Sequence, residues 1–502
     1  MDDSFLYTIS NSITGTPILD NLKYIIIIFV TLSIFIASIF FSKKINKKTI
    51  IFDSIFILTT LIYLIYSEPA VNLTNLLSAK KNISDVNNEY IINSNIVNSI
   101  NGNYIIILAE SLEHSFKDID GINYLRNITK LDNQVSFSNI GYVRGSGWTI
   151  AGHVSFICGV PLIGTGNSAG KIKTFLPKAT CFSDIISNAG YMNIYLSGTD
   201  INFAGTRNFL ESHSFSSIID KNILSKKYPE EQFKTKWGID DKVVFDEAFN
   251  IFVDKSKLNK PFSLFVSTIN THSPGHTSFS CDTHIDDSYL NSVICADKTI
   301  AEFISKVQHT EYYDNTTIIL ISDHGLMHWE SLIGKRMHRS NLFSVFHKNL
   351  RNEVVNTEGT VLDQLPTALE VVSRTKSELG FGRSIYSENR SLGKLNDTHN
   401  DFARSLWAYP SMYHKIRFNN KNQVEIGSVK FSLPLCVYFK DDKLIEFGYE
   451  DGFYQRCLDD ISHKSDKNIF VAKKCGDKIC SIVYKNFIST ESDKSDISNL
   501  FH

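Results

Sequence analysis

The stretch Thr316–Gly325 (TTIILISDHG) joins a run of apolar and β-branched residues to an aspartate and a histidine. A continuous apolar run of this length is typical of a strand that is buried on both faces of a parallel sheet. Similar runs occur at Tyr104–Ala109 (YIIILA), Asn193–Leu196 and Phe262–Thr268 (FSLFVST). They alternate with stretches that favour helices, near Asp240–Val253, Tyr289–Val307 and Leu362–Val372. The sequence therefore predicts an α/β sandwich with a mainly parallel central sheet.

Polar side chains follow three of these predicted strands. In an open α/β sheet, ligands bind beyond the carboxyl ends of the strands. Glu110 follows YIIILA, His272 follows FSLFVST, and Asp323 and His324 follow TTIILI. Taken singly, each has an ordinary structural interpretation, such as a charge at a helix start or a satisfied loop side chain. Together, two carboxylates and imidazole nitrogens at one sheet edge suit a divalent Mn²⁺, Zn²⁺ or Mg²⁺ ion.

A glycine-punctuated loop, Arg144–His153 (RGSGWTIAGH), leads into the apolar run VSFICGVPL. This pattern is typical of a tight turn that opens a helix, with Thr149 in the first turn. The hydroxyl there has a simple alternative role as a helix N-cap. The same position also lies at the positive end of the helix dipole, where phosphate oxygens are stabilised. Because a metal ion makes a neighbouring hydroxyl far more acidic, the sequence predicts Thr149 as a nucleophile.

Composition and charge bound the class of protein. The 502 residues include 51 Lys+Arg and 53 Asp+Glu, which excludes a typical nucleic-acid binder with its clustered basic excess. Two apolar stretches, at residues 24–41 and 49–66, are long enough to cross a bilayer. A secretory signal and a buried hairpin are the alternatives. Four lysines between the stretches indicate a cytoplasmic loop, so the chain after about Ser67 is expected on the outer side.

The cysteines agree with an outer location, because all eight follow the apolar stretches and disulfides persist outside the cytoplasm. Cys281/Cys295 and Cys475/Cys480 are plausible bridges, although eight cysteines leave the pairing open. We expect four parts: a membrane anchor with two transmembrane helices at 1–67, a polar linker at 68–102, a catalytic domain at 103–395, and a small β-rich, disulfide-linked module at 400–502.

Seven motifs resemble those of the phosphoglycerol transferase I family of bacterial envelope enzymes: ILAESLE, GSGWTIAGHVSFICGVPL, FAGTRNF, NTHSPGH, SDHG, MHRSNLF and DQLPTAL. The resemblance extends from Tyr104 to Tyr386. That family is related to lipoteichoic acid synthase and to lipid A phosphoethanolamine transferases, within the alkaline phosphatase/sulfatase superfamily. The resemblance implies an alkaline phosphatase/sulfatase-like fold for the catalytic domain.

The resemblance also implies roles for particular residues. Glu110, Thr149, Asp323 and His324 would hold one metal ion, usually Mn²⁺ or Zn²⁺ in the relatives, with Thr149 as the phosphorylated nucleophile. His272 would contact the phosphoryl group and help proton transfer. The substrate-binding candidates are Phe203 and Arg207, in a segment that lines the donor headgroup pocket of relatives, and Arg339, for which an ordinary surface charge is the alternative.

Together with the two apolar stretches, the resemblance implies a transferase of the bacterial inner membrane with its catalytic domain on the periplasmic side. It would move glycerol phosphate from phosphatidylglycerol, or from a glycerophosphorylated glycan, to an envelope glycan through a covalent phospho-threonine. The family commonly has more than two membrane helices, which bears on how a lipid donor is presented.

Three alternatives remain: phosphoethanolamine transfer, a sulfatase-like phosphodiesterase, and an inactive glycan-binding homologue. A sulfatase would need a Cys or Ser in a C/S-x-P/A-x-R context, which the sequence around Thr149 lacks. A two-metal phosphodiesterase usually adds an Asp-x-x-x-His pair, which we do not find between Tyr191 and Asp323.

Overall fold

The computed structural model describes two compact units of the 502-residue chain. The described residues are 86, 89–91, 95–163, 175–176, 178–258, 260–282, 285–327, 329, 338–406, 416–419, 423–426, 429–440, 443–448, 451–462, 468–475 and 478–484. Thr180–Arg404 belongs to the larger unit, and the residues after Arg404 belong to the smaller one. The predicted membrane anchor and much of the predicted linker lie outside the described residues. Across the described ranges, no helix combines the length and the apolar character that a bilayer crossing requires.

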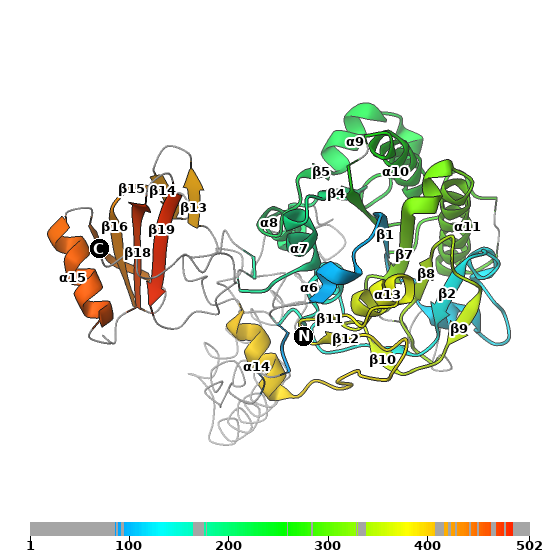
Figure 1. The fold of residues 1–502 in the computed structure, drawn as a ribbon. Coiled ribbons are helices and arrows are strands. Elements are labelled where there is room, and N and C mark those ends of the chain that lie inside the picture. The colour runs from blue at the N-terminus through cyan, green and yellow to red at the C-terminus, as the bar shows by residue number, and fades with distance from the viewer. Residues whose placement is uncertain are drawn as a thin grey trace, which may run out of the picture. The chain divides into compact units, whose positions relative to one another are not determined.

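An eight-stranded sheet, in the order β5-β4-β6-β1-β7-β8-β2-β9, forms the centre of the larger unit (Figure 1). The middle strands β4 (Met192–Ser197), β6 (Phe262–Ser267), β1 (Asn103–Ala109) and β7 (Thr316–Ser322) are parallel neighbours. On one side, β5 (Ser217–Ile219) continues this parallel set. On the other, β8 (Phe343–Phe346) runs antiparallel to β7 and β2 (Gln134–Phe137), and β9 (Glu353–Val355) is parallel to β2. The predicted mainly parallel sheet is therefore confirmed.

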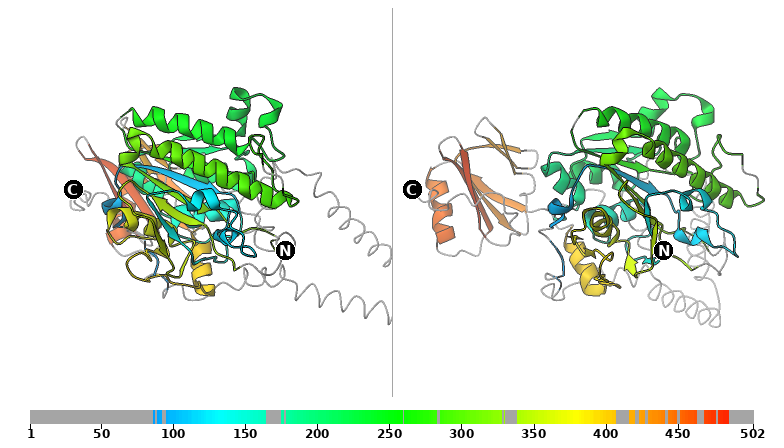
Figure 2. Two further views of the ribbon diagram at one scale, coloured as in Figure 1. Left: turned by 90° about the vertical axis from the view of Figure 1, so that its right-hand side faces the viewer. Right: turned by 45° about the vertical axis from the view of Figure 1, so that its right-hand side comes forward.

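Helices cover both faces of this sheet. On one face, α10 (Asp241–Ser256) and α11 (Ser288–Gln308) lie side by side (Figure 2) and share a buried apolar cluster with alternate residues of β1, among them Ile105 and Ile107. On the other face, Tyr104 of β1 meets Phe182 of α7 (Phe182–Asn188), with ring centroids 5.7 Å apart. Because side chains alternate across a strand, a β1 that is apolar throughout buries both of its faces.

The second face also carries α6 (Thr149–Cys158) and α13 (Gln364–Ser373). All four predicted strands, and helices within a few residues of the three predicted ranges, are present in the structure. Among the described residues of the larger unit, the other α-helices are α5 (Arg126–Thr129), α8 (Thr206–Ser212), α9 (Lys221–Lys227) and α14 (Asp397–Ser405). The same residues include two short strand pairs: β3 (Ile140–Gly141) with β10 (Gly359–Thr360), and β11 (Glu378–Leu379) with β12 (Gly382–Arg383).

The described residues of the smaller unit form two antiparallel sheets and one helix, α15 (Asp451–Ser462). Three strands form the first sheet: β13 (Ile416–Asn419), β14 (Gln423–Ile426) and β15 (Val429–Ser432). Four form the second, in the order β17 (Lys443–Gly448), β16 (Leu435–Lys440), β18 (Asn468–Cys475) and β19 (Lys478–Tyr484). A small buried cluster between the second sheet and α15 includes Cys436, Tyr438 and Leu458.

Three disulfides are present among the described residues: Cys158–Cys181, Cys281–Cys295 and Cys436–Cys457. The predicted Cys281–Cys295 bridge is confirmed. The side chains of Cys475 and Cys480, the other predicted pair, lie outside the described part of the structure.

Candidate functional site

The carboxyl ends of β1 and β7 bring Glu110, Asp323 and His324 together. Ala109 pairs with Ser322 across these parallel strands, so Glu110 and Asp323 leave the sheet at the same level. One ligand atom from each of the three residues lies within 4.8 Å of the others. The Nε2 atom of His324 is 3.1 Å from Oε1 of Glu110 and 3.8 Å from Oδ2 of Asp323. All three side chains are buried.

Thr149 joins this cluster from α6. The helix begins at Thr149, directly after the extended residue Trp148, and the Thr149 hydroxyl donates to Oε2 of Glu110 at 3.3 Å. Gly152, one turn along the helix, lets α6 approach closely: a Cβ atom there would lie 1.6 Å from the carbonyl oxygen of Asp323. The four residues predicted to hold a metal ion thus converge on one place.

The unsatisfied atoms of the cluster fit a cation. Oδ1 of Asp323 accepts the backbone N–H groups of Ser111 and His324, at 3.0 and 2.7 Å, whereas Oδ2 is buried with no hydrogen-bond partner among the described residues. Nδ1 of His324 donates to the carbonyl of Gly325 at 2.8 Å, so the lone pair of the neutral imidazole lies on Nε2, toward the carboxylates. A buried carboxylate oxygen without a partner is costly. Two carboxylates, an imidazole and a hydroxyl are ligands that suit a divalent ion.

Glu110, Asp323 and His324 strongly affect one another's pKa values. Burial acts to raise the pKa of Glu110, but His324, His272 and the Ser111 hydroxyl outweigh it and lower that pKa to about 2. Burial and the charge of Glu110 raise the pKa of Asp323 well above its usual value. Burial opposes the charged form of His324, yet Asp323 and Glu110 raise its pKa to about 10. A positive charge between Glu110 and Asp323 is therefore strongly favoured, and a proton or a metal ion can supply it.

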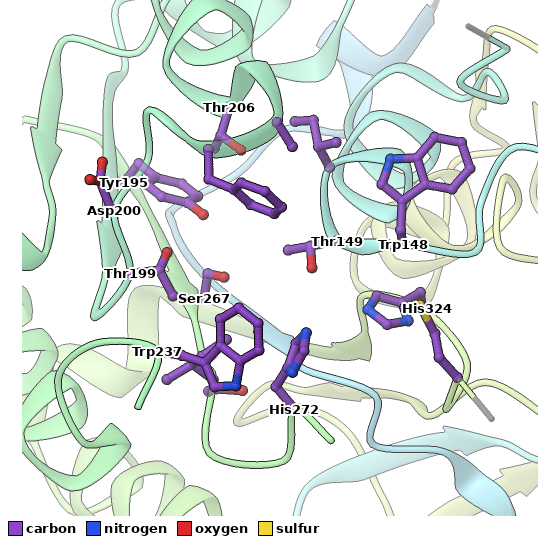
Figure 3. A pocket seen from close by; sticks show the side chains of 16 residues that line it. Trp148, Thr149, Tyr195, Thr199, Asp200, Thr206, Trp237, Ser267, His272 and His324 are labelled. Carbon is purple, nitrogen blue, oxygen red and sulfur yellow. The ribbon is translucent and has the colours of Figure 1, made fainter. Parts of the chain in front are cut away.

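A cavity of about 160 Å³ opens beside the cluster, and Thr149, His272 and His324 all line it (Figure 3). Its walls are aromatic on several sides, with Trp148, Tyr195, Phe203 and Trp237. Hydroxyl groups and one carboxylate are also present, from Thr199, Thr206, Ser267 and Asp200. The cavity is therefore suited to a small polar group that carries an apolar or carbon-rich part.

His272 lies at the wall of this cavity beside Trp237, with ring centroids 4.2 Å apart (Figure 3). Its Nδ1 donates to the carbonyl oxygen of Ser273 at 3.0 Å when the ring is neutral. This hydrogen bond fixes the tautomer and leaves Nε2 as the atom that can exchange a proton.

The substrate-binding candidates are placed differently from one another. Phe203 lines the cavity, whereas Arg207 is not among its lining residues in the described part of the chain. Nε of Arg207 donates to Oδ1 of Asn202 at 2.7 Å, and the guanidinium group lies 3.5 Å from the buried carboxylate of Asp220. Arg207 therefore stabilises the conformation of the segment that carries Phe203.

Arg339 likewise lies outside the cavity lining and binds within the protein. Its Nε is 3.0 Å from Oε1 of the fully buried Glu113, and its Nη2 donates to the Leu326 carbonyl at 2.9 Å. The rings of Tyr142 and Trp329 lie 5.6 and 5.3 Å from the guanidinium carbon. Because Glu113 also accepts the N–H of Leu326 at 2.7 Å, Arg339 holds the loop that follows His324.

Sequence reasoning missed Asp200, Tyr195 and Trp237, which all line the cavity. A signal existed for Asp200, since it follows the strand β4 by three residues and strand ends are where ligands bind. Trp237 offered no such signal, because it reaches the cavity from the segment before α10 through contacts distant in sequence.

A mainly parallel sheet with carboxylates, an imidazole and a helix-borne hydroxyl at one edge defines an alkaline phosphatase/sulfatase-like α/β protein. The chain belongs to the Sulfatase family, which it matches over residues 102–373.

The most similar curated relatives include "Phosphoglycerol transferase I" of Xanthomonas campestris pv. campestris (strain B100), 32% identical over 373 residues, which cover 69% of this chain and 53% of the relative. The protein of the same name from Citrobacter koseri is 30% identical over 365 residues, 68% of this chain and 47% of the relative. The chain thus spans about half the length of the curated relatives it matches.

Among solved structures, the lipoteichoic acid synthase LtaP from Listeria monocytogenes is 15% identical, with a TM-score of 0.46 and coverage of 63% of this chain and 81% of the other. The curated relatives confirm the resemblance inferred from the motifs.

Proposed function

We propose that this chain transfers glycerol phosphate from phosphatidylglycerol to a cell-envelope glycan, with Thr149 as the covalent nucleophile. One observation carries the proposal: the Thr149 hydroxyl lies 3.3 Å from Glu110, within the cluster that Glu110, Asp323 and His324 form. The similarity to proteins named phosphoglycerol transferase I supports the choice of the transferred group.

Glu110, Thr149, Asp323 and His324 would hold one divalent ion, preferably Mn²⁺, with Zn²⁺ and Mg²⁺ as alternatives. When bound, such an ion makes the neighbouring hydroxyl more acidic and offsets negative charge on phosphoryl oxygens. The position of Thr149 at the start of the ten-residue helix α6 adds a second source of positive potential. Backbone N–H groups at a helix N-terminus point toward a bound phosphate.

The proposed reaction has two steps that share one proton carrier. The Thr149 hydroxyl first releases its proton to solvent. Its Oγ1 then attacks the phosphorus of the donor, the bond from phosphorus to the diacylglycerol oxygen breaks, and Nε2 of His272 gives a proton to that oxygen. A glycan hydroxyl next attacks the phosphorus of the phospho-threonine and gives its proton to Nε2 of His272. The bond from phosphorus to Oγ1 breaks, and Oγ1 takes a proton from solvent to restore the Thr149 hydroxyl. His272 is placed for both steps because it lines the same cavity as Thr149.

The donor in this proposal is a membrane lipid, so the catalytic domain must work beside a bilayer. The apolar stretches at residues 24–41 and 49–66 would serve as anchors and would place the domain on the periplasmic side. This part of the proposal rests on the sequence, because both stretches lie outside the described residues.

A second candidate is the transfer of ethanolamine phosphate. The carboxylate of Asp200 lines the cavity together with the rings of Tyr195, Phe203 and Trp237. A carboxylate and aromatic faces attract an ammonium group, whereas a glycerol headgroup would use the hydroxyl groups of the same wall.

Mass spectrometry of the Thr149 peptide, after incubation of the full chain with both phospholipids, tests the two candidates. The expected result is the added mass of glycerol phosphate, and the mass of ethanolamine phosphate would favour the second candidate. Turnover without any adduct, in rapidly quenched samples, would refute the covalent step. Thr149→Ala should lose both adduct and turnover, whereas Thr149→Ser, the matched control, keeps a hydroxyl and should still form the adduct.

A further inference from the structure

The loop Thr268–Ser278, here called the His272 loop, carries His272 away from the end of β6. The backbone hydrogen bonds of His272 stay within the loop. Its N–H donates to the carbonyl oxygen of Ile269 at 2.9 Å, and its carbonyl oxygen accepts the N–H of Gly275 at 2.8 Å. Among the described residues, the only hydrogen bond of the imidazole is the one between Nδ1 and the carbonyl oxygen of Ser273. The position of the ring therefore depends on what holds the two legs of the loop.

Asp241 holds the first leg. Its Oδ1 accepts the backbone N–H of Ile269 at 2.8 Å, and its Oδ2 accepts that of Asn270 at 2.9 Å. The side chain is 4% exposed. Both oxygens of one carboxyl group are thus used on two consecutive peptide groups, which fixes the direction in which the chain enters the loop.

Asp240, the preceding residue, holds the other leg. Its Oδ1 accepts the Ser278 hydroxyl at 2.8 Å, and its Oδ2 lies 3.4 Å from Nε2 of His276. Oδ2 also accepts the Asn270 side-chain amide at 3.1 Å, which links the two legs. Asp240 is fully buried and is the N-cap of α10, since Oδ1 also accepts the N–H of Lys242 at 2.9 Å.

The segment Trp237–Asp241 (WGIDD) also ties the His272 loop to the opposite wall of the cavity. Trp237 contacts the His272 ring. The N–H of Ile239 donates to the carbonyl oxygen of Gly198 at 2.9 Å, and Gly198 directly follows β4. Gly238 permits this approach, since a Cβ there would lie 2.0 Å from the Gly198 oxygen. One short segment therefore spans both walls of the site.

We propose that Asp240 and Asp241 are positioning residues that hold Nε2 of His272 at the reacting oxygen and so control proton transfer in both steps. The inference rests on the proposed function, because it assigns a device to the proton carrier of that reaction. Neither aspartate contacts the cavity or is a ligand in the metal cluster. The backbone of Glu110 is bonded to the same loop through the Thr268 and Thr271 hydroxyls, and neither bond involves the aspartates. Substitution of Asp240 or Asp241 should therefore impair proton transfer and leave metal binding and the nucleophile in place.

Leaving-group dependence separates this role from a merely structural one. The probe pair is phosphatidylglycerol, whose alkoxide leaving group needs a proton, and the 4-nitrophenyl ester of glycerol phosphate, whose phenolate leaves without one. In Asp241→Asn, an amide N–H₂ faces a backbone N–H in place of one accepting oxygen. We expect kcat/KM for the lipid donor to fall roughly 100-fold, and that for the aryl donor to fall less than about threefold.

The benchmark is His272→Ala, which should show the same selective loss. The double variant His272→Ala/Asp241→Asn should be no slower on the lipid donor than His272→Ala alone, because the imidazole that Asp241 would position is already missing. Asp246→Asn is the matched control: this partly exposed aspartate lies on the same helix, pairs with Lys306 at 3.6 Å, and should leave both rates unchanged.

The outcomes distinguish the inference from the function it rests on. Equal losses on both donors in Asp241→Asn, with a selective loss in His272→Ala, would overturn the positioning role and leave the proposed reaction intact. An unselective loss in His272→Ala would overturn the proton-carrier assignment itself. If Asp241→Asn does not fold, Ser278→Ala, which deletes the bond to Asp240, provides the same comparison with a smaller selective loss expected; equal losses there would again overturn the positioning role.

Discussion

Gly152→Ala is the smallest change that should move Thr149, the proposed nucleophile, away from the cluster of Glu110, Asp323 and His324. Gly152 lies in α6, three residues after Thr149, and faces the backbone that carries Asp323. An added Cβ would lie 1.6 Å from the Asp323 oxygen and 2.5 Å from its carbonyl carbon. These are backbone atoms at the end of a central strand, so no flexible side chain can move aside.

The size of the effect follows from this distance. Ordinary van der Waals contact begins near 3.4 Å, so relief along the line of contact requires a shift of about 1.8 Å. Overpacking of this kind costs about 1–3 kcal/mol of stability in protein cores. A misplacement of about 1 Å between reacting groups can lower a rate roughly 100-fold. We therefore expect a fall in kcat/KM of about 100-fold or more, with a folded protein.

The assay is lipid turnover, with metal affinity and thermal stability measured on the same samples. Gly147→Ala is the control, because it precedes Thr149 by two residues and an added Cβ there meets no atom within 4 Å. The control should retain its activity. Near-normal turnover in Gly152→Ala would show that the close approach of α6 does not set the geometry of the site, and would refute the reasoning.

Three further predictions follow from the same structure. Asp323→Asn should bind less than one-tenth of the metal that the wild-type protein binds at equal free concentration, measured by elemental analysis after dialysis. The reason is that it replaces a carboxylate whose buried Oδ2 has no hydrogen-bond partner among the described residues, and full occupancy would show that the ligand set is wrong. Burial raises the pKa of Asp241 from 3.8 to about 8, so the folded state keeps a proton that the unfolded state loses, and the free energy of unfolding should fall between those pH values. Urea titrations across that range should show the fall, and Asp241→Asn should flatten it; identical slopes would contradict the assignment. Replacing Cys158 and Cys181 by alanine should lower stability by about 2–4 kcal/mol in urea titrations, because the bridge closes a 23-residue separation; unchanged stability would argue against a structural role.

The four central strands could be predicted because strands buried on both faces must be apolar throughout. The same logic located Glu110, Asp323 and His324, since parallel strands end at a common edge. It could not find β2 and β8, which are four residues each and carry serine within buried positions. Their burial comes from neighbours in the sheet, which local sequence does not reveal.

Arg339 shows where residue type is insufficient. A guanidinium group near a predicted phosphate site is a reasonable phosphate ligand, and a surface charge was the alternative considered. The structure pairs Arg339 with Glu113, which is 226 residues away in sequence and fully buried. The sequence showed Glu113 only as part of the ILAESLE motif, with nothing to indicate its partner.

The site depends on backbone contacts as much as on the side chains that face the cavity. Gly152 sets α6 against the end of β7, Arg339 and Glu113 hold the loop after His324, and Asp241 directs the His272 loop. Because these contacts act on different elements, damage to each should impair a different part of the reaction. A change at Gly152 should act on the proposed nucleophile and on binding of the proposed ion, whereas a change at Asp241 should act on proton transfer alone. If all such variants lost metal binding, nucleophilic attack and proton transfer together, the elements would have to move as one body. These contacts would then not control separate steps of the reaction.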